Sequence, residues 1–71
     1  MRKDPRDPAL EEAIRTSGGV VALSLKLGVT AGAVSQWDKA PWKQVIAIER
    51  VTGVHRARLR PDLYPPEIGA T

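Results

Sequence analysis

Apolar residues recur along this chain at helical spacing, in short blocks that glycine and proline separate. Blocks of this kind predict short amphipathic helices that each turn one face to a shared core. The apolar positions of successive blocks are Leu10, Ala13 and Ile14; Val20, Leu23 and Leu27; Val34 and Trp37; and Val45, Ile48 and Val51 or Thr52. No long stretch alternates apolar and polar residues, as a half-buried strand would. We therefore expect an all-α fold, a compact bundle of four to five short helices.

Capping residues mark where these helices begin and end. Pro8 fits the first position of the first helix, where its missing N–H costs nothing, and Asp7 is the N-cap. Gly28 follows the second helix where a left-handed residue is favoured, and Thr30 is a good N-cap for the third. Pro41 ends the third region and opens the fourth helix. The first helix is predicted to begin at Pro8 and to be terminated by Ser17-Gly18-Gly19. The others are predicted over about residues 19–27, 30–39 and 41–52, with one further turn at 56–60.

The second and third helices have the spacing of a helix-turn-helix. Residues 20–39 read VVALSLKLGVTAGAVSQWDK, in which a glycine-containing turn joins two short helices. Ser24 is the small residue expected where the two helices cross, and Trp37 is expected in the core because it lies three positions after Val34. A purely structural helical hairpin packs by the same logic. The spacing alone therefore leaves DNA binding and a structural role open.

Positive charge is concentrated in the middle of the chain. Residues 15–60 carry eight basic and two acidic side chains, a net charge of +6, whereas residues 1–14 carry −1 and residues 61–71 carry −2. A field of this sign attracts polyanions such as nucleic acid. A basic surface that only keeps the protein soluble has the same composition. Charge alone does not choose between the two.

Composition argues against several function classes. A chain of 71 residues fits one small domain, and the absence of cysteine excludes a disulfide, a thiolate zinc site and a cysteine nucleophile. His55 is the only histidine, and the adjacent Glu11 and Glu12 diverge around a helix, so we expect no enzyme, metal or cofactor. No apolar run is long enough to span a bilayer, and no export signal precedes the domain. We expect a cytoplasmic protein that does not bind membranes.

The two chain ends are predicted to differ from the domain between them. Residues 1–7 are expected to form a flexible arm, residues 8–60 the helix-turn-helix domain and residues 61–71 an irregular tail. The basic residues of the arm either follow DNA or are disordered; they are Arg2, Lys3 and Arg6. The tail around Leu63-Tyr64-Pro65-Pro66 is expected to pack on its own domain, with a second subunit or another protein as alternatives. Trp42 is expected in the core, with a protein interface as the alternative.

Several motifs together resemble a known family. They are the glycine pair before the first motif helix, the LGVT turn, the AVSQW run, the proline before the next helix, the AIERVTG segment and the LRPDLYP tail. Over about residues 18–66 the chain is similar to the Cro-like phage and prophage repressors that include the YdaS-type proteins. The resemblance implies a five-helix, lambda-repressor-like DNA-binding domain that regulates transcription, often encoded beside prophage or toxin–antitoxin genes.

In a helix-turn-helix, the outward face of the second helix reads base edges in the major groove. The predicted base contacts are Thr30, Ala31, Gly32, Ser35, Gln36 and Lys39. Gln36 is the best base reader, since its amide can form two hydrogen bonds with adenine. Ala31 and Gly32 stand where related repressors usually carry longer polar side chains, so DNA shape or water is expected to add specificity.

The predicted phosphate contacts lie on either side of this helix. They are Ser17, Lys26 and Lys43, with Lys39 a candidate for phosphate as well as bases and Arg56, Arg58 and Arg60 a further possibility. A solvated surface position is an equal alternative for any single one of these cations.

We therefore expect a regulator that binds double-stranded DNA as a homodimer. Its two recognition helices would lie about 34 Å apart, on successive major-groove faces of a palindromic operator. The alternative is an antitoxin-like interaction module, whose main partner is a toxin or another protein and which uses Trp42 and the tail. Steep loss of binding with added salt marks the first, because phosphate contacts release counterions.

Overall fold

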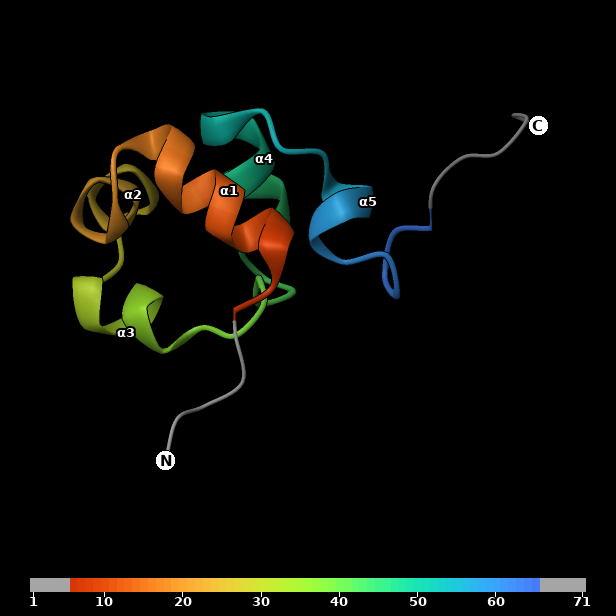
Figure 1. Ribbon diagram of the computed structural model, residues 1–71, viewed down its shortest axis with the longest axis horizontal. Helices are drawn as coiled ribbons and strands as arrows, with labels where there is room; N and C mark the ends of the chain where they lie inside the picture. The colour runs from red at the N-terminus through yellow and green to blue at the C-terminus, as the bar shows by residue number, and fades with distance from the viewer. Residues whose placement is uncertain (1–5, 66–71) are drawn as a thin grey trace.

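The computed structural model describes residues 6–65, which fold into a bundle of five short helices (Figure 1). The helices are α1 (Pro8–Ser17), α2 (Val20–Leu27), α3 (Ala31–Gln36), α4 (Val45–Thr52) and α5 (Arg56–Leu59). Within residues 6–65 no strand is present. The predicted all-α class is therefore confirmed.

A single apolar core holds the helices together. Every helix contributes at least one fully buried side chain to it, and the largest of these are Leu10, Leu23, Val34, Val45, Ile48 and Leu59. Complete burial of one such side chain contributes about 1.5–3 kcal/mol to the free energy of unfolding. Half-buried Val20, Leu27 and Trp37 pack against the same core. The core role predicted for Trp37 is thus confirmed.

Local capping rules account for most helix ends. The Asp7 carboxylate accepts a hydrogen bond from the Leu10 N–H, with Pro8 at the first helical position. Thr30 Oγ1 accepts from the Ala33 N–H at 3.1 Å, as its predicted N-cap role requires. Gly28 adopts a φ of 75°, and its N–H donates to the Ser24 carbonyl. Glycine suits this position because a side chain disfavours the left-handed region.

The third and fourth helices are shorter than predicted. α3 ends at Gln36, and α4 begins at Val45 after a turn that a 2.8 Å hydrogen bond closes, from the Gln44 N–H to the Pro41 carbonyl. In a longer α3 the Ser35 carbonyl would pair with the N–H of Lys39, but it accepts from Arg6 instead. The prediction over residues 30–39 therefore missed the end of α3, where a long-range hydrogen bond is found in place of a helical one.

Trp42 is the clearest error in the predicted core. It lies in the turn over residues 42–44, and 64% of its surface is exposed. The prediction placed Trp42 at the start of a fourth helix that begins at Pro41. Because the helix begins only at Val45, nothing turns Trp42 inward.

Both ends of the described chain contact the segment between α3 and α4. The Asp7 N–H donates to the Asp38 carbonyl at 2.8 Å, and the Arg60 guanidinium donates to the Ala40 carbonyl at 2.9 Å. Tyr64 packs against the core, as expected for the tail, whereas Leu63 is exposed. Of the predicted arm and tail, residues 1–5 and 66–71 lie outside the described residues, and with them Arg2, Lys3 and Pro66.

Candidate nucleic-acid interface

The α2–α3 pair is packed as a helix-turn-helix requires. Ser24 is only 3% exposed, and its hydroxyl donates to the Val21 carbonyl at 2.7 Å within its own helix. The small side chain therefore fits the buried contact without leaving a polar atom unpaired. Val34 fills the inner side of α3, and Val29 in the turn packs against the core. This packing leaves the other side of α3 free to face a ligand.

The outer face of α3 is polar, but the residues at the start of the helix have short side chains. Thr30 and Gly32 are exposed there, and Ala31 is half-buried. Ser35 and Gln36 are exposed in the last turn and supply the hydroxyl and amide of this surface. Five of the predicted base-contact residues therefore lie on or next to α3, and only two of them reach outward with a long or freely rotating polar group.

Lys39, the sixth predicted base contact, lies beyond the helix. It is exposed in the bend that follows α3. Its charge is close enough to Asp62 to help lower the pKa of that carboxyl, as the last of several causes. Its place beside α3, and not on it, suits a phosphate contact better than a base contact.

The predicted phosphate contacts lie on three different segments of the fold. Lys26 is exposed in the last turn of α2, and Lys43 is exposed in the turn before α4, with its ammonium 5.4 Å from the Trp42 ring centre. Ser17 is half-buried at the end of α1, where its hydroxyl donates to the Ile14 carbonyl at 2.9 Å. That bond occupies its proton, so Ser17 is a weaker phosphate donor than the two lysines.

The arginines in and after α5 each form an ion pair within the protein. Arg56 pairs with Glu49 at 2.8 Å, Arg58 with Glu12 at 2.5 Å and Arg60 with Asp62 at 2.8 Å. Sequence reasoning counted these arginines as part of a positive field and missed their partners. Only the Asp62 pair is close in sequence, and no local pattern marks the other two.

Hydrogen bonds in these pairs shift the ionisation of the acids. The bond from Arg58, reinforced by its charge, lowers the pKa of Glu12 and raises the pKa of Arg58 in return. The bond from Arg60 lowers the pKa of Asp62 to about 2. Both acids are charged at neutral pH, and each partly neutralises the charge of the arginine that it pairs with.

Five basic side chains form no ion pair among residues 6–65. They are Arg15, Lys26, Lys39, Lys43 and Arg50. All five are exposed. Three of them are the lysines that flank α3 along the chain, so the candidate interface keeps positive charge that the fold does not neutralise.

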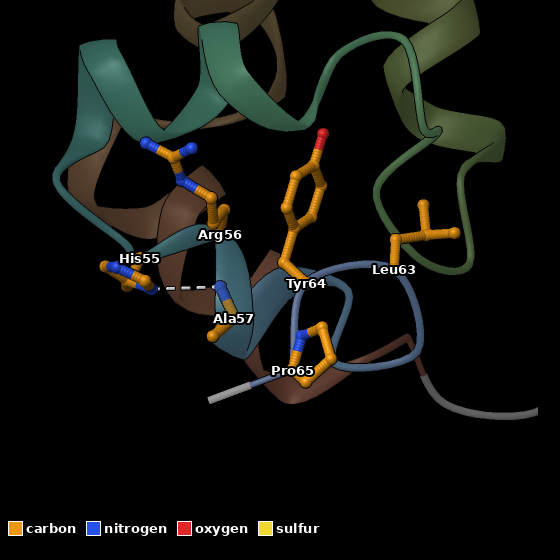
Figure 2. A pocket seen from close by; sticks show the side chains of 6 residues that line it. All are labelled: His55, Arg56, Ala57, Leu63, Tyr64 and Pro65. Atoms are coloured by element: carbon orange, nitrogen blue, oxygen red, sulfur yellow. Dashed lines mark hydrogen bonds between the residues drawn. The ribbon is translucent and has the colours of Figure 1, made fainter. Parts of the chain in front are cut away.

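A concave region lies between α5 and the tail. It is an open pocket of about 450 Å³, lined by His55, Arg56, Ala57, Leu63, Tyr64 and Pro65 (Figure 2). His55 Nδ1 accepts from the Ala57 N–H at 3.0 Å and so caps α5, while the Arg56 guanidinium lies 5.7 Å from the Tyr64 ring centre. These roles are structural, and the pocket brings together no nucleophile with a base.

Within residues 6–65, no group of three or more histidine, cysteine or acidic residues is placed to hold a metal ion. No helix there is both long and apolar enough to cross a membrane.

The chain is similar to known proteins over most of its length. Residues 10–68 match the family described as bacterial toxin YdaS. A solved structure of the Cro protein from the putative prophage element Xfaso 1 in Xylella fastidiosa strain Ann-1 is 40% identical in sequence, with a TM-score of 0.77. The similarity covers 82% of this chain and 97% of that protein. A comparison with curated proteins found no match.

Proposed function

This chain belongs to the family described as bacterial toxin YdaS, and from that premise we propose that it is a Cro-like regulator that binds double-stranded DNA sequence-specifically. The observation that carries the proposal is the exposed polar face of α3, held on a packed α2–α3 pair and flanked along the chain by three lysines that form no ion pair within residues 6–65. Such a face matches the shape and charge of a major groove.

The proposed contacts divide into two kinds. Gln36 and Ser35 read base edges, with Thr30 and Ala31 approaching the groove at the start of α3 and Gly32 allowing close approach of the backbone. Lys26, Lys39 and Lys43 bind phosphates on either side and fix the register without reading sequence. Ser17 contributes at most one weak phosphate bond. With few base contacts available, we assign part of the specificity to DNA shape and ordered water.

We place the DNA-binding domain at residues 8–60 and propose that two copies act together. A homodimer would set its recognition helices about 34 Å apart, which matches one turn of the double helix. The action is occupancy of an operator or promoter in the cytoplasm, without chemistry.

Selection of bound duplexes from a random pool tests this proposal. We expect a palindromic site with half-sites about one helical turn apart. Gln36→Ala should then lose discrimination at one base pair per half-site, by about 1–3 kcal/mol, and leave the salt dependence of binding unchanged. Thr16→Ala, an exposed polar substitution on α1, is the matched control. Failure to enrich any sequence, with no binding at low salt, would refute the proposal.

The exposed Trp42 favours a second candidate function. An interaction module with a toxin or another protein as partner would use Trp42 and the tail residue Leu63, which are 64% and 44% exposed. Large exposed aromatic side chains are common anchors of protein interfaces. Trp42→Ser should abolish such binding and leave the discrimination between DNA sequences unchanged, because Trp42 lies outside the proposed base-reading surface. Retained partner binding would remove this candidate.

A further inference from the structure

The recognition helix ends differently from its neighbours. α1, α2 and α4 each end on a left-handed glycine whose N–H bonds back to a carbonyl of the same helix. α3 has no such glycine and no basic residue in its last turn, and it ends at Trp37 in an extended conformation with φ −75° and ψ 128°. The carbonyl groups at its end therefore find their donors outside the helix, in side chains or water.

Arg6 supplies these donors from the start of the described chain. Its Nε donates to the Trp37 carbonyl and its Nη2 to the Ser35 carbonyl, both at 3.2 Å. Its Nη1 donates to the Glu11 carboxylate at 3.4 Å, which orients the guanidinium from α1. The planar guanidinium carries several donors in a rigid fork and so reaches both carbonyls at once. Its positive charge also lies at the negative end of the helix dipole.

The backbone beside Arg6 reinforces the contact. The Asp7 N–H donates to the Asp38 carbonyl at 2.8 Å, so two successive residues hold the chain just after α3. The Arg6 side chain is only 24% exposed. Its donors are directed into the protein, and little of it remains for a DNA phosphate.

We propose that Arg6 is a positioning residue for α3. It ends the helix after Gln36 and ties that end to the start of α1, which sets where Ser35 and Gln36 are presented to DNA. The contribution to DNA reading rests on the proposed function. The structural part stands separately, because it concerns only how α3 is held.

Amide hydrogen exchange in the full-length protein tests the structural part without DNA. Arg6→Gln is compared with Arg58→Gln, a control whose arginine pairs with the α1 residue Glu12 but has no hydrogen bond to α3. The Trp37 N–H, which donates to the Val34 carbonyl at 3.1 Å, should exchange about tenfold faster in Arg6→Gln and unchanged in the control. Equal exchange in both variants would overturn the proposal.

Binding to a selected duplex and to a scrambled duplex tests the reading part. Arg6→Gln should weaken binding to the selected duplex by about tenfold, leave the scrambled duplex unchanged and keep the same dependence on salt. Arg6→Lys should recover only part of the loss, since one ammonium cannot bridge both carbonyls. Full recovery by Arg6→Lys would overturn the bridging role.

Two other outcomes separate the proposal from its alternatives. Equal weakening on both duplexes, with a salt slope reduced by about 0.9, would make Arg6 a phosphate contact and overturn the positioning role. If the unmodified protein binds neither duplex at low salt, the proposed function fails, and the exchange measurement alone decides whether Arg6 holds α3.

Discussion

Basic residues form two groups along the chain, one on the segments that flank α3 and the other in and after α5, and α3 and α5 lie on different sides of α1 (Figure 1). Around α3, the lysines at 26, 39 and 43 are exposed and form no ion pair within residues 6–65. In and after α5, the arginines at 56, 58 and 60 each pair with an acid. The two groups thus carry the same number of positive charges, but within residues 6–65 only the arginines form ion pairs.

The difference shows why net charge is a poor guide to a binding surface. A guanidinium paired with a carboxylate has its charge partly neutralised and at least one of its N–H donors occupied before any ligand arrives. An exposed ammonium that forms no ion pair within residues 6–65 can instead neutralise a phosphate and release the counterions condensed on the DNA. The six charges therefore count equally in the field of the chain, but only three of them are available at the candidate interface.

The largest change in DNA affinity is expected between two double variants, one that removes two lysines flanking α3 along the chain and one that removes two arginines of α5. The double variant with Lys39→Ala and Lys43→Ala should lower DNA affinity by roughly 50- to 100-fold at about 0.1 M salt. Each lost phosphate contact reduces by about 0.9 the slope of log affinity against log salt concentration, and two such losses give this factor. Arg56→Ala with Arg58→Ala makes the same change in net charge and should cost less than about threefold. Titrations of one duplex at several salt concentrations measure both. Equal losses would mean that net charge alone governs binding.

Substitution of Arg60 should change the stability of the fold and not the salt dependence of DNA binding. Its side chain is 16% exposed and donates to the Ala40 carbonyl, so Arg60→Gln leaves a part-buried acceptor unpaired. We expect the free energy of unfolding to fall by about 1–3 kcal/mol. Urea denaturation measures this change, and the salt slope of DNA binding should stay the same. A reduced slope with unchanged stability would place Arg60 among the phosphate contacts.

A smaller effect is expected from acid. Asp62 has a pKa of about 2 in the folded protein because Arg60 donates hydrogen bonds to it, against about 3.9 for an unperturbed aspartate. The depressed pKa means that this pair stabilises the fold above about pH 4 and loses its contribution as the pH falls through about 2. Asp62→Asn should remove that part of the acid dependence. Unfolding midpoints between pH 2 and pH 5 would reveal it, and identical profiles would contradict the pairing.

The smallest effect is expected at Arg58. Its pair with Glu12 is exposed on both sides, so water and salt screen it. Arg58→Gln should change DNA affinity by less than about twofold and lower the unfolding midpoint only slightly. The shift should vanish in about 1 M salt. A shift that persists at high salt would mean that packing of the arginine stem, and not its charge, stabilises this contact.

Much of the fold follows from rules that act over a few residues. Asp7 and Thr30 cap helices as their types predict, and Gly28 takes the left-handed conformation that ends α2. Ser24 is buried where the two motif helices cross. In each case the physical cause lies within about four positions along the chain, so the pattern of residues is enough to predict it.

The outer face of α3 could be predicted for the same reason. Helical periodicity turns Val34 inward and therefore places Ser35 and Gln36 outward, whichever elements surround the helix. Lys39 was assigned to this helix as well, and that assignment failed because the helix ends three residues earlier. Its place off the helix depends on contacts that no local pattern contains.

Residue types and their spacing were thus sufficient to predict the all-α class, most caps and the helix-turn-helix. The end of α3 and the partner of each charged side chain could be read only from the folded arrangement. Arg6 reaches Trp37 across 31 positions, and Arg58 reaches Glu12 across 46. A side chain forms such a bond only when packing of the core brings its partner within about 3 Å. Composition records the charges at both ends of these contacts, but only the packed helices show which of them meet.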